Sequence, residues 1–169
     1  MRKIAYVVAA AALVLGGCAA KKSVEAPSVL KPDRRYLEAL RHTQRGDISV
    51  SLENKAQIIA TYLNPLDERR YRDTEAFFVR IYIDNDFEDE NRSGLFNPYY
   101  RLTLNGDEPK KIQKIDYDEA AAMDMPFVKK WYKLYIVEFN ASQKRNLDLK
   151  LTHPEFGSAV LRFRNSDAY

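Results

Sequence analysis

The sequence predicts a mainly β protein: an antiparallel β-sandwich preceded by a short helix, with one or two helical turns inserted between its strands. Two observations support this fold class. Apolar and polar residues alternate with a period of two in many short runs after residue 47. Gly, Pro, Asn and Asp residues, which favour turns, separate these runs. Short alternating strands joined by turns are typical of two packed antiparallel sheets.

The first expected element is a helix over residues 34–44. Leu37 and Leu40 recur there at helical spacing. Asp33 is a suitable N-terminal cap, and Gly46 is a suitable residue to end the helix.

Eight strands are expected after this helix. The run 76–84 places Phe77 and Val79 on one face and Phe78 and Arg80 on the other. The expected strands cover residues 48–52, 55–63, 76–84, 99–106, 110–118, 131–140, 146–152 and 158–165. The fifth of them is polar and is therefore expected at the edge of a sheet.

Two segments interrupt the strands, at residues 65–75 and 117–130, and both are expected to form short helices or helical turns. Pro126 is expected to stop the second of them. The complete pattern is similar to an immunoglobulin-like sandwich in architecture. The Cys-Trp-Cys hallmark of true immunoglobulin domains is absent, so the resemblance does not extend to that family.

The N-terminal residues 1–17 have the layout of a secretory signal peptide. Arg2 and Lys3 precede an apolar stretch over 4–15, which is shorter than the roughly 20 residues that span a bilayer. The following tetrapeptide Leu15-Gly16-Gly17-Cys18 resembles the lipobox of bacterial lipoproteins. That resemblance implies cleavage before Cys18 and attachment of acyl chains to this cysteine.

The same resemblance implies where the mature protein is held. Stable attachment to a bilayer requires more than one acyl chain, and lipoprotein cysteines carry three. Ala19 does not resemble the aspartate that retains lipoproteins at the inner membrane, so the outer membrane is expected. The domain is expected on either its periplasmic or its surface-exposed face. Residues 18–33 contain two prolines and no periodicity, which predicts a flexible tether before a domain over 34–169.

Charge and cysteine content restrict the function classes. Removing Arg2 and Lys3 lowers the net charge from +3 to +1, so no nucleic-acid partner is expected. Cys18 is the only cysteine, and its acylation leaves none for a disulfide. The domain is therefore expected to be stabilised by its core alone.

The sequence predicts no enzyme and no cofactor. His42 and His153 are the two histidines, and neither lies in a known catalytic or metal-binding motif. The glycines do not form a phosphate-binding loop. A hydrolase built on two facing carboxylates is the less favoured enzymatic alternative.

An acidic stretch over 84–94 is the densest cluster of charge in the chain. Closely spaced oxygen ligands bind calcium, so Asp84, Asp86 and Glu88 are candidates for a weak calcium site. The EF-hand pattern does not fit, because Asp89 and Leu95 stand where that motif requires Gly and Glu. A solvated loop is the alternative interpretation.

Two Asn-x-Ser patterns make Asn91 and Asn140 candidate N-glycosylation sites. Each has an acidic residue two positions before the asparagine, namely Asp89 and Glu138. This extended pattern resembles the acceptor site of campylobacter-like bacterial glycosylation systems. Both are expected in loops between strands, and chance occurrence is the alternative.

The chain is rich in tyrosine, and Tyr82, Tyr100 and Tyr132 are candidates for an exposed contact surface. The favoured function is a lipid-anchored, non-enzymatic module for binding, adhesion or assembly. Its expected partner is a protein or an envelope polymer. An accessory subunit of an envelope secretion or appendage machine is the alternative.

Overall fold

The computed structural model describes residues 33–165 of the chain. The predicted signal peptide, Cys18 and the predicted tether up to residue 32 lie outside these residues. Within residues 33–165, no helix has both the length and the apolar character needed to cross a membrane.

The described chain is mainly strand. Its helices are α1 (Arg34–Arg41) and α2 (Tyr117–Ala122), and its 3-10 turns are η1 (Asn64–Leu66), η2 (Glu90–Arg92) and η3 (Gly94–Phe96). Its strands are β1 (Thr43–Val50), β2 (Glu53–Tyr62), β3 (Thr74–Ile83), β4 (Arg101–Leu104), β5 (Lys111–Ile115), β6 (Lys133–Asn140), β7 (Asn146–His153) and β8 (Gly157–Arg164).

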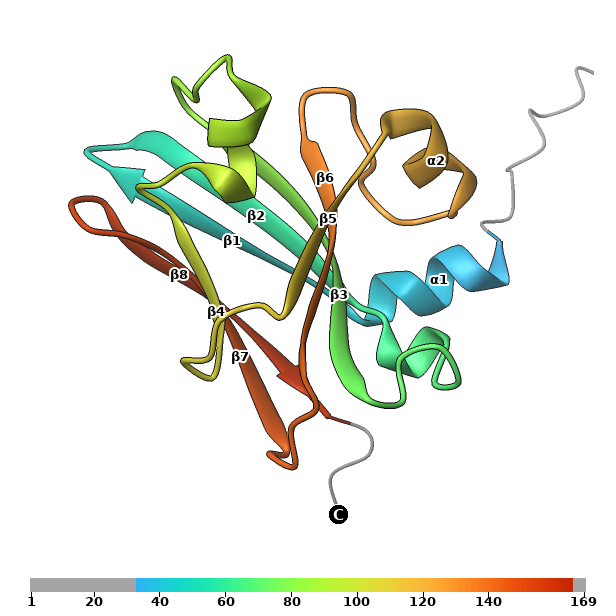
Figure 1. The fold of residues 1–169 in the computed structure, drawn as a ribbon. Coiled ribbons are helices and arrows are strands. Elements are labelled where there is room, and N and C mark those ends of the chain that lie inside the picture. The colour runs from blue at the N-terminus through green and yellow to red at the C-terminus, as the bar shows by residue number, and fades with distance from the viewer. Residues whose placement is uncertain (1–32, 166–169) are drawn as a thin grey trace, which may run out of the picture. The chain divides into compact units, whose positions relative to one another are not determined.

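The strands form two antiparallel sheets that pack face to face (Figure 1). The five-stranded sheet has the order β1-β2-β3-β6-β5, and the three-stranded sheet has the order β4-β7-β8. The β-sandwich expected from the alternating runs is confirmed. Strand β5 lies at an edge of the larger sheet, as its polar sequence predicts.

The main core lies between the two sheets. Phe77, Val79 and Ile81 of β3 are almost fully buried there, together with Leu149 of β7 and Leu161 of β8. These residues alternate along their strands with residues of the opposite face, which is the pattern that a sandwich requires.

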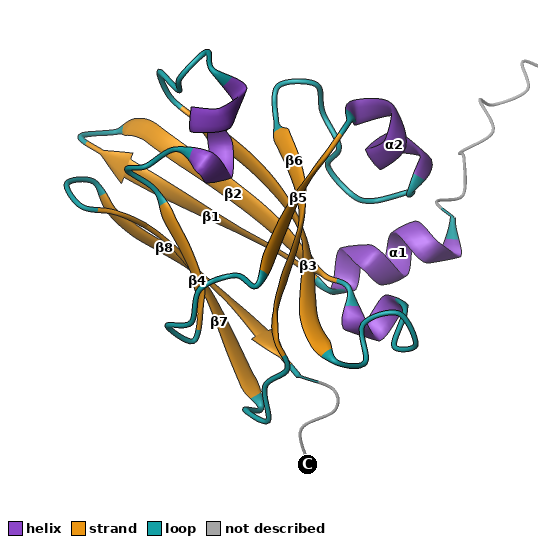
Figure 2. Ribbon diagram, in the orientation of Figure 1, coloured by secondary structure: helices purple, strands orange, loops and turns teal. Residues whose placement is uncertain are grey.

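A second apolar cluster covers the outer face of the five-stranded sheet. Helices α1 and α2 lie on the side of this sheet that faces away from β4, β7 and β8 (Figure 2). Ala39 of α1 and Ala120 of α2 are buried there against Phe78 of β3. The central strand β3 is therefore buried on both faces, which explains why its sequence is apolar almost throughout.

The predicted helix over 34–44 starts where expected but ends earlier. Asp33 caps α1, because its carboxylate accepts a hydrogen bond from the backbone N–H of Arg35 at 3.1 Å. The expectation that Gly46 ends the helix is wrong, since strand β1 begins at Thr43 and includes Gly46. A β-carbon at Gly46 would lie 2.9 Å from Leu161 Cδ1, so the glycine permits close approach of β1 to β8.

Other boundaries differ because tight turns occupy the ends of the predicted runs. The run 48–52 includes Ser51 and Leu52, which form the turn between β1 and β2 and both have a positive φ. The strand expected over 131–140 starts only at Lys133, so Trp131 lies before β6 and is exposed. The helix predicted over 117–130 is confined to α2.

Candidate functional site

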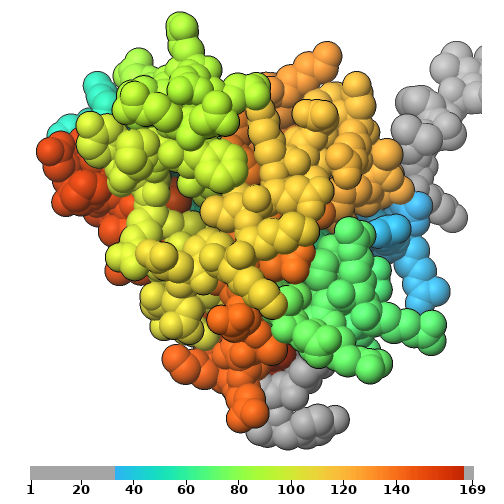
Figure 3. All heavy atoms as spheres, in the orientation of Figure 1, coloured from blue at the N-terminus to red at the C-terminus, as the bar shows by residue number. Residues whose placement is uncertain are grey.

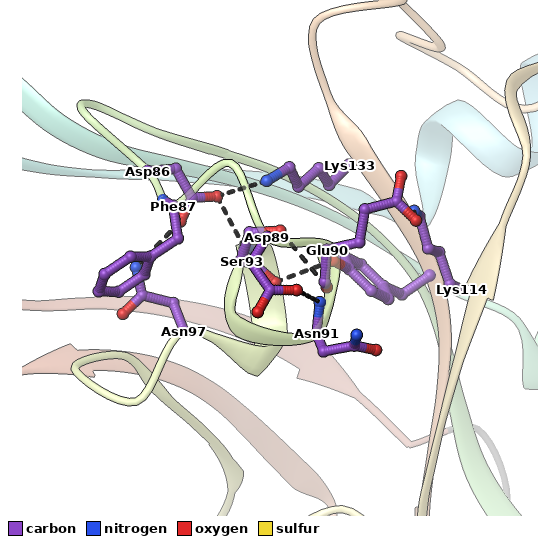
Figure 4. Close-up of polar contacts among 11 residues, drawn as sticks. Asp86, Phe87, Asp89, Glu90, Asn91, Ser93, Asn97, Lys114 and Lys133 are labelled. Carbon is purple, nitrogen blue, oxygen red and sulfur yellow. Dashed lines mark hydrogen bonds and ion pairs between the residues drawn. The ribbon is translucent and has the colours of Figure 1, made fainter.

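The acidic stretch predicted as a possible calcium site lies between β3 and β4. Asp86 in this stretch is fixed by several hydrogen bonds, which the close-up shows (Figure 4). Its carboxylate accepts hydrogen bonds from Lys133 Nζ at 2.8 Å, from the backbone N–H of Gly94 at 2.7 Å and from Asn97 Nδ2 at 3.0 Å. Asp86 therefore ties its loop to strand β6 and to the turn at η3.

The environment of Asp86 favours its charged form. Burial by itself raises the pKa of this carboxyl, but the hydrogen bonds from Lys133, Gly94 and Asn97 lower it more, and the net pKa lies below the ordinary value. Glu90 nearby accepts from Lys114 at 2.8 Å, and this contact lowers the pKa of Glu90 as well.

The three predicted calcium ligands do not converge on one point. Asp84 lies 3.4 Å from Lys55 Nζ, Asp86 is held by Lys133, and Glu88 is exposed. Within the described part of the chain, no group of three or more His, Cys, Asp or Glu side chains is placed to hold a metal ion. Lysines and backbone donors bind two of these carboxylates, and calcium binding at this stretch stays a prediction.

Both candidate glycosylation asparagines are exposed. Asn91 lies in η2, inside the loop where it was expected, and its backbone N–H donates to Asp89. Asn140 is the last residue of β6 and is paired with Thr74, so it stands at a strand end rather than in a loop. Modification of either asparagine stays a prediction.

The three tyrosines predicted as one contact surface do not share a face. Tyr100 is only 8% exposed in the core between the sheets, where its hydroxyl donates to the carbonyl of Lys55 at 3.2 Å. Tyr82 and Tyr132 lie on the outer side of the five-stranded sheet beside Gln57, to which the hydroxyl of Tyr132 donates. The prediction is therefore wrong for Tyr100.

The two histidines have structural contacts. His153 ends β7, and its Nδ1 accepts the backbone N–H groups of Glu155 at 3.1 Å and Phe156 at 3.2 Å. Its ring also stacks on Phe156, with 4.1 Å between the centroids. His153 thus holds the hairpin connection that the sequence predicts. His42 caps the end of α1 and lies 3.5 Å from Glu38.

The strongest candidate for a binding site is an apolar pocket on the outer side of the five-stranded sheet. It lies between α1, the first two strands and the segment before β6, and its volume is about 440 Å³. Its lining consists of Leu40, Thr43, Gln44, Arg45, Ile59, Phe127, Lys129, Trp131 and Tyr132. We call it the aromatic pocket. Its volume lies in the range of ordinary ligand-binding pockets.

Large apolar side chains at the rim of the aromatic pocket are exposed to solvent. Trp131 is 65% exposed, Phe127 is 46% exposed, and Leu40 is similar. Trp and other aromatic residues are enriched at binding hot spots, and a group of exposed apolar side chains around a pocket marks an interaction site. Phe127 also has a positive φ of 58°, a backbone conformation that is unusual for a bulky residue.

Arg80 of β3 is completely buried next to this region, since its cross-strand partner Ile59 lines the pocket. Its Nη2 donates to Thr61 Oγ1 at 2.7 Å, and its guanidinium lies over the ring of Phe78 at 4.8 Å. Among the described residues, its Nε and Nη1 atoms have no hydrogen-bond partner. Burial lowers the pKa of Arg80 to about 9, so the group is still charged at neutral pH.

A larger hollow of about 640 Å³ on the outer face of the three-stranded sheet is a weaker candidate. Its lining is strongly charged, and its two arginines have acidic partners. Arg101 pairs with Glu108 at 2.7 Å, and Arg162 lies 3.9 Å from Asp148. Exposed ion pairs of this kind are typical of a solvated sheet face.

Most residues of the aromatic pocket were not predicted. Tyr132 is the one lining residue that the sequence indicated as part of a contact surface. Arg80 left a visible signal, because it is a lone charge in an otherwise apolar strand. Trp131 and Phe127 were not predicted as binding residues, since their exposure depends on the path of the chain between α2 and β6. Atoms of the gold part of the chain, which includes α2, lie at the molecular surface in the view of Figure 3.

The class of protein that fold and site define is a β-sandwich with an open apolar pocket beside one sheet. No family model matches the chain, and no match to it was found among the curated proteins or the solved structures.

Proposed function

We propose that this protein is a non-enzymatic binding module, held at the bacterial outer membrane by acyl chains on Cys18. In this proposal the aromatic pocket docks a protein partner or an envelope polymer. The observation that carries the proposal is the cluster of exposed apolar side chains, Trp131, Phe127 and Leu40, around a pocket that is apolar inside.

The construction of the domain supports a binding role. The pocket floor belongs to a sheet that is packed on both faces, so its position is fixed by two apolar clusters. A preorganised surface of this kind loses little conformational entropy when it binds. The aromatic rim side chains have few rotatable bonds, which lowers this cost further.

Site-specific photo-crosslinking in whole cells tests this proposal. In the test variant a photoreactive amino acid replaces Trp131. In the control variant it replaces Val160, which is exposed on the outer face of the three-stranded sheet. We expect a crosslinked product at position 131 that is absent at position 160 and is lost when Phe127→Ala is added. Equal products at both positions, or none at position 131, would contradict the proposal.

The same crosslinks separate the two roles considered from the sequence. A fixed set of envelope proteins joined through position 131 would indicate an accessory subunit of an envelope machine. A single protein or a polymer of variable length would indicate an independent binding or adhesion module.

A further inference from the structure

We infer that the aromatic pocket accepts an alkyl carboxylate, whose carboxylate pairs with Arg80 and whose apolar chain lies along the pocket wall. This inference rests on the proposed function, because it concerns the same pocket. It adds the chemical class of the ligand.

The first argument is the state of the Arg80 side chain. A guanidinium carries one N–H at Nε and two at each Nη. Nε and Nη1 together hold three N–H donors without an acceptor among residues 33–165. No described Asp or Glu forms an ion pair with Arg80, and its one hydrogen bond goes to a neutral hydroxyl. An uncompensated buried charge is strongly unfavourable, so a site that retains one requires an explanation.

The second argument places Arg80 at the pocket. Ile59 lines the pocket and is the cross-strand partner of Arg80. Thr43 also lines it and is linked to Arg80 through Thr61, since the two threonine hydroxyls are 2.7 Å apart. Tyr132, a third lining residue, is near enough to raise the pKa of Arg80. Arg80 itself does not line the pocket, but its cross-strand partner Ile59 and two further residues coupled to it do.

The third argument is charge. The pocket lining includes Arg45 and Lys129 and contains no acidic residue. Arg45 is paired with Asp47 at 3.2 Å, so Lys129 and the buried Arg80 supply the attraction for an anion. A single buried guanidinium neutralises one negative charge. A carboxylate matches that charge and the planar geometry of the guanidinium, whereas a phosphate monoester carries nearly two charges and requires more donors.

The fourth argument concerns access to Arg80. The segment over residues 123–132 packs on the outer face of this sheet, where Met125 is buried and Val128 half-buried in the apolar cluster that includes Phe78. Asp124 and Phe127 in this segment both have a positive φ, at 53° and 58°. Such conformations cost about 1–3 kcal/mol each and occur often at ligand-binding segments. Displacing this segment therefore costs less than displacing a relaxed one.

Fluorescence of Trp131 provides a direct test, because it is the only tryptophan of the chain and lies at the pocket rim. The full acylated protein in detergent is titrated with octanoate and, separately, with octanamide, its neutral analogue of nearly equal size. We expect octanoate to bind about tenfold tighter or more, as a hydrogen-bonded charge pair implies. Both probes partition into micelles, so the ratio of their affinities is compared between protein variants.

Two variants and one further measurement complete the test. Arg80→Met should abolish the preference for octanoate, whereas the matched change Arg162→Met on the exposed face of β8 should preserve it. If Arg80→Met does not fold, the NMR resonance of the Arg80 Nε–H group is followed in the wild-type protein instead. Octanoate should shift that resonance and octanamide should leave it unchanged.

Three results would overturn the inference. Equal affinity for the two probes would show that the pocket does not recognise the carboxylate and binds only the apolar chain. A preference that persists in Arg80→Met would place the carboxylate elsewhere. Absence of saturable binding by either probe would exclude this ligand class, and crosslinking through position 131 would then still decide the proposed function.

Discussion

Arg80 is a charged side chain buried among apolar neighbours. Its neighbours on the outer face of the sheet include Phe78 and Leu134, both buried. A buried guanidinium with unpaired donors is expected to lower stability.

Replacing this arginine with a hydrophobic residue of similar length is therefore expected to stabilise the protein. Arg80→Met should raise the free energy of unfolding by about 1 kcal/mol or more, because it removes the buried charge and fills the same space. Thr61 keeps its hydrogen bond to Thr43 in the variant. Chemical denaturation measures the effect, and a marked loss of stability would show that Arg80 supports the fold.

Gly46 is the second residue whose role depends on its neighbours. Gly46→Ala should lower the free energy of unfolding by about 1–3 kcal/mol, because the added methyl would lie 2.9 Å from Leu161 Cδ1 and 3.0 Å from Ala159 Cβ. Thermal denaturation tests this. Adding Ala159→Gly should restore part of the loss, and strictly additive effects would exclude the contact.

At the scale of single elements, the hairpin between β1 and β2 has an unusual turn. Its two loop residues, Ser51 and Leu52, have φ values of 50° and 71°, and the Leu52 side chain is fully exposed. Two-residue hairpin loops with positive φ favour Asn and Gly, because glycine has no β-carbon to strain the backbone.

Leu52→Gly should therefore raise the free energy of unfolding by about 1 kcal/mol. Leu52→Ala is the matched control, since it removes the exposed side chain but keeps the strained β-carbon, and it should change stability little. Denaturant midpoints of the two variants decide the matter. Equal stabilisation by both would mean that exposure of the leucine, rather than backbone strain, is responsible.

The loop between β3 and β4 depends on Asp86 and should make stability depend on pH. The native pKa of Asp86 is below its ordinary value, so this carboxylate stabilises the fold above the unfolded-state pKa. The contribution is lost as the pH falls through the lower native pKa. Asp86→Asn should be less stable at neutral pH, by about 1–3 kcal/mol, and should lose less stability on acidification.

Unfolding curves recorded from neutral to acidic pH measure this difference. Glu88→Gln is the matched control, because Glu88 lies in the same loop and is exposed. It should follow the wild-type curve. An Asp86→Asn curve parallel to wild type at every pH would exclude the proposed contribution of the ion pair with Lys133.

At the scale of the whole molecule, the proposed function requires attachment through Cys18. Cys18→Ser should abolish incorporation of a labelled fatty acid and remove the processed protein from the envelope fraction, because no other residue is expected to carry acyl chains. Ser23→Ala in the predicted tether is the control and should leave labelling unchanged. Processed Cys18→Ser protein that stays with the envelope would contradict lipid anchoring.

Much of the fold could be predicted because its signals are local. Patterns within about five to ten neighbouring residues predicted all eight strands, and Asp33 marked the start of α1. The ends of elements were less predictable. Thr43 starts a strand inside the predicted helix because it pairs with Thr61, which no pattern near residue 43 reveals.

The candidate site was mostly beyond prediction for the same reason. Asp86 looks like a calcium ligand beside its acidic neighbours in sequence, but Lys133 comes from a distant strand to bind it. Tyr100 resembles Tyr82 in its local pattern, yet the packing of the second sheet buries it.

By itself, the sequence determined the fold class and the number of strands, since both depend on residues adjacent in the chain. Its N-terminal residues also predict attachment to a membrane. Only the tertiary structure decided which strands pair, which carboxylates have partners, and that Arg80 lies buried next to an open aromatic pocket. These properties depend on burial and on contacts between distant segments, and both arise only when β3 is enclosed between the two apolar clusters.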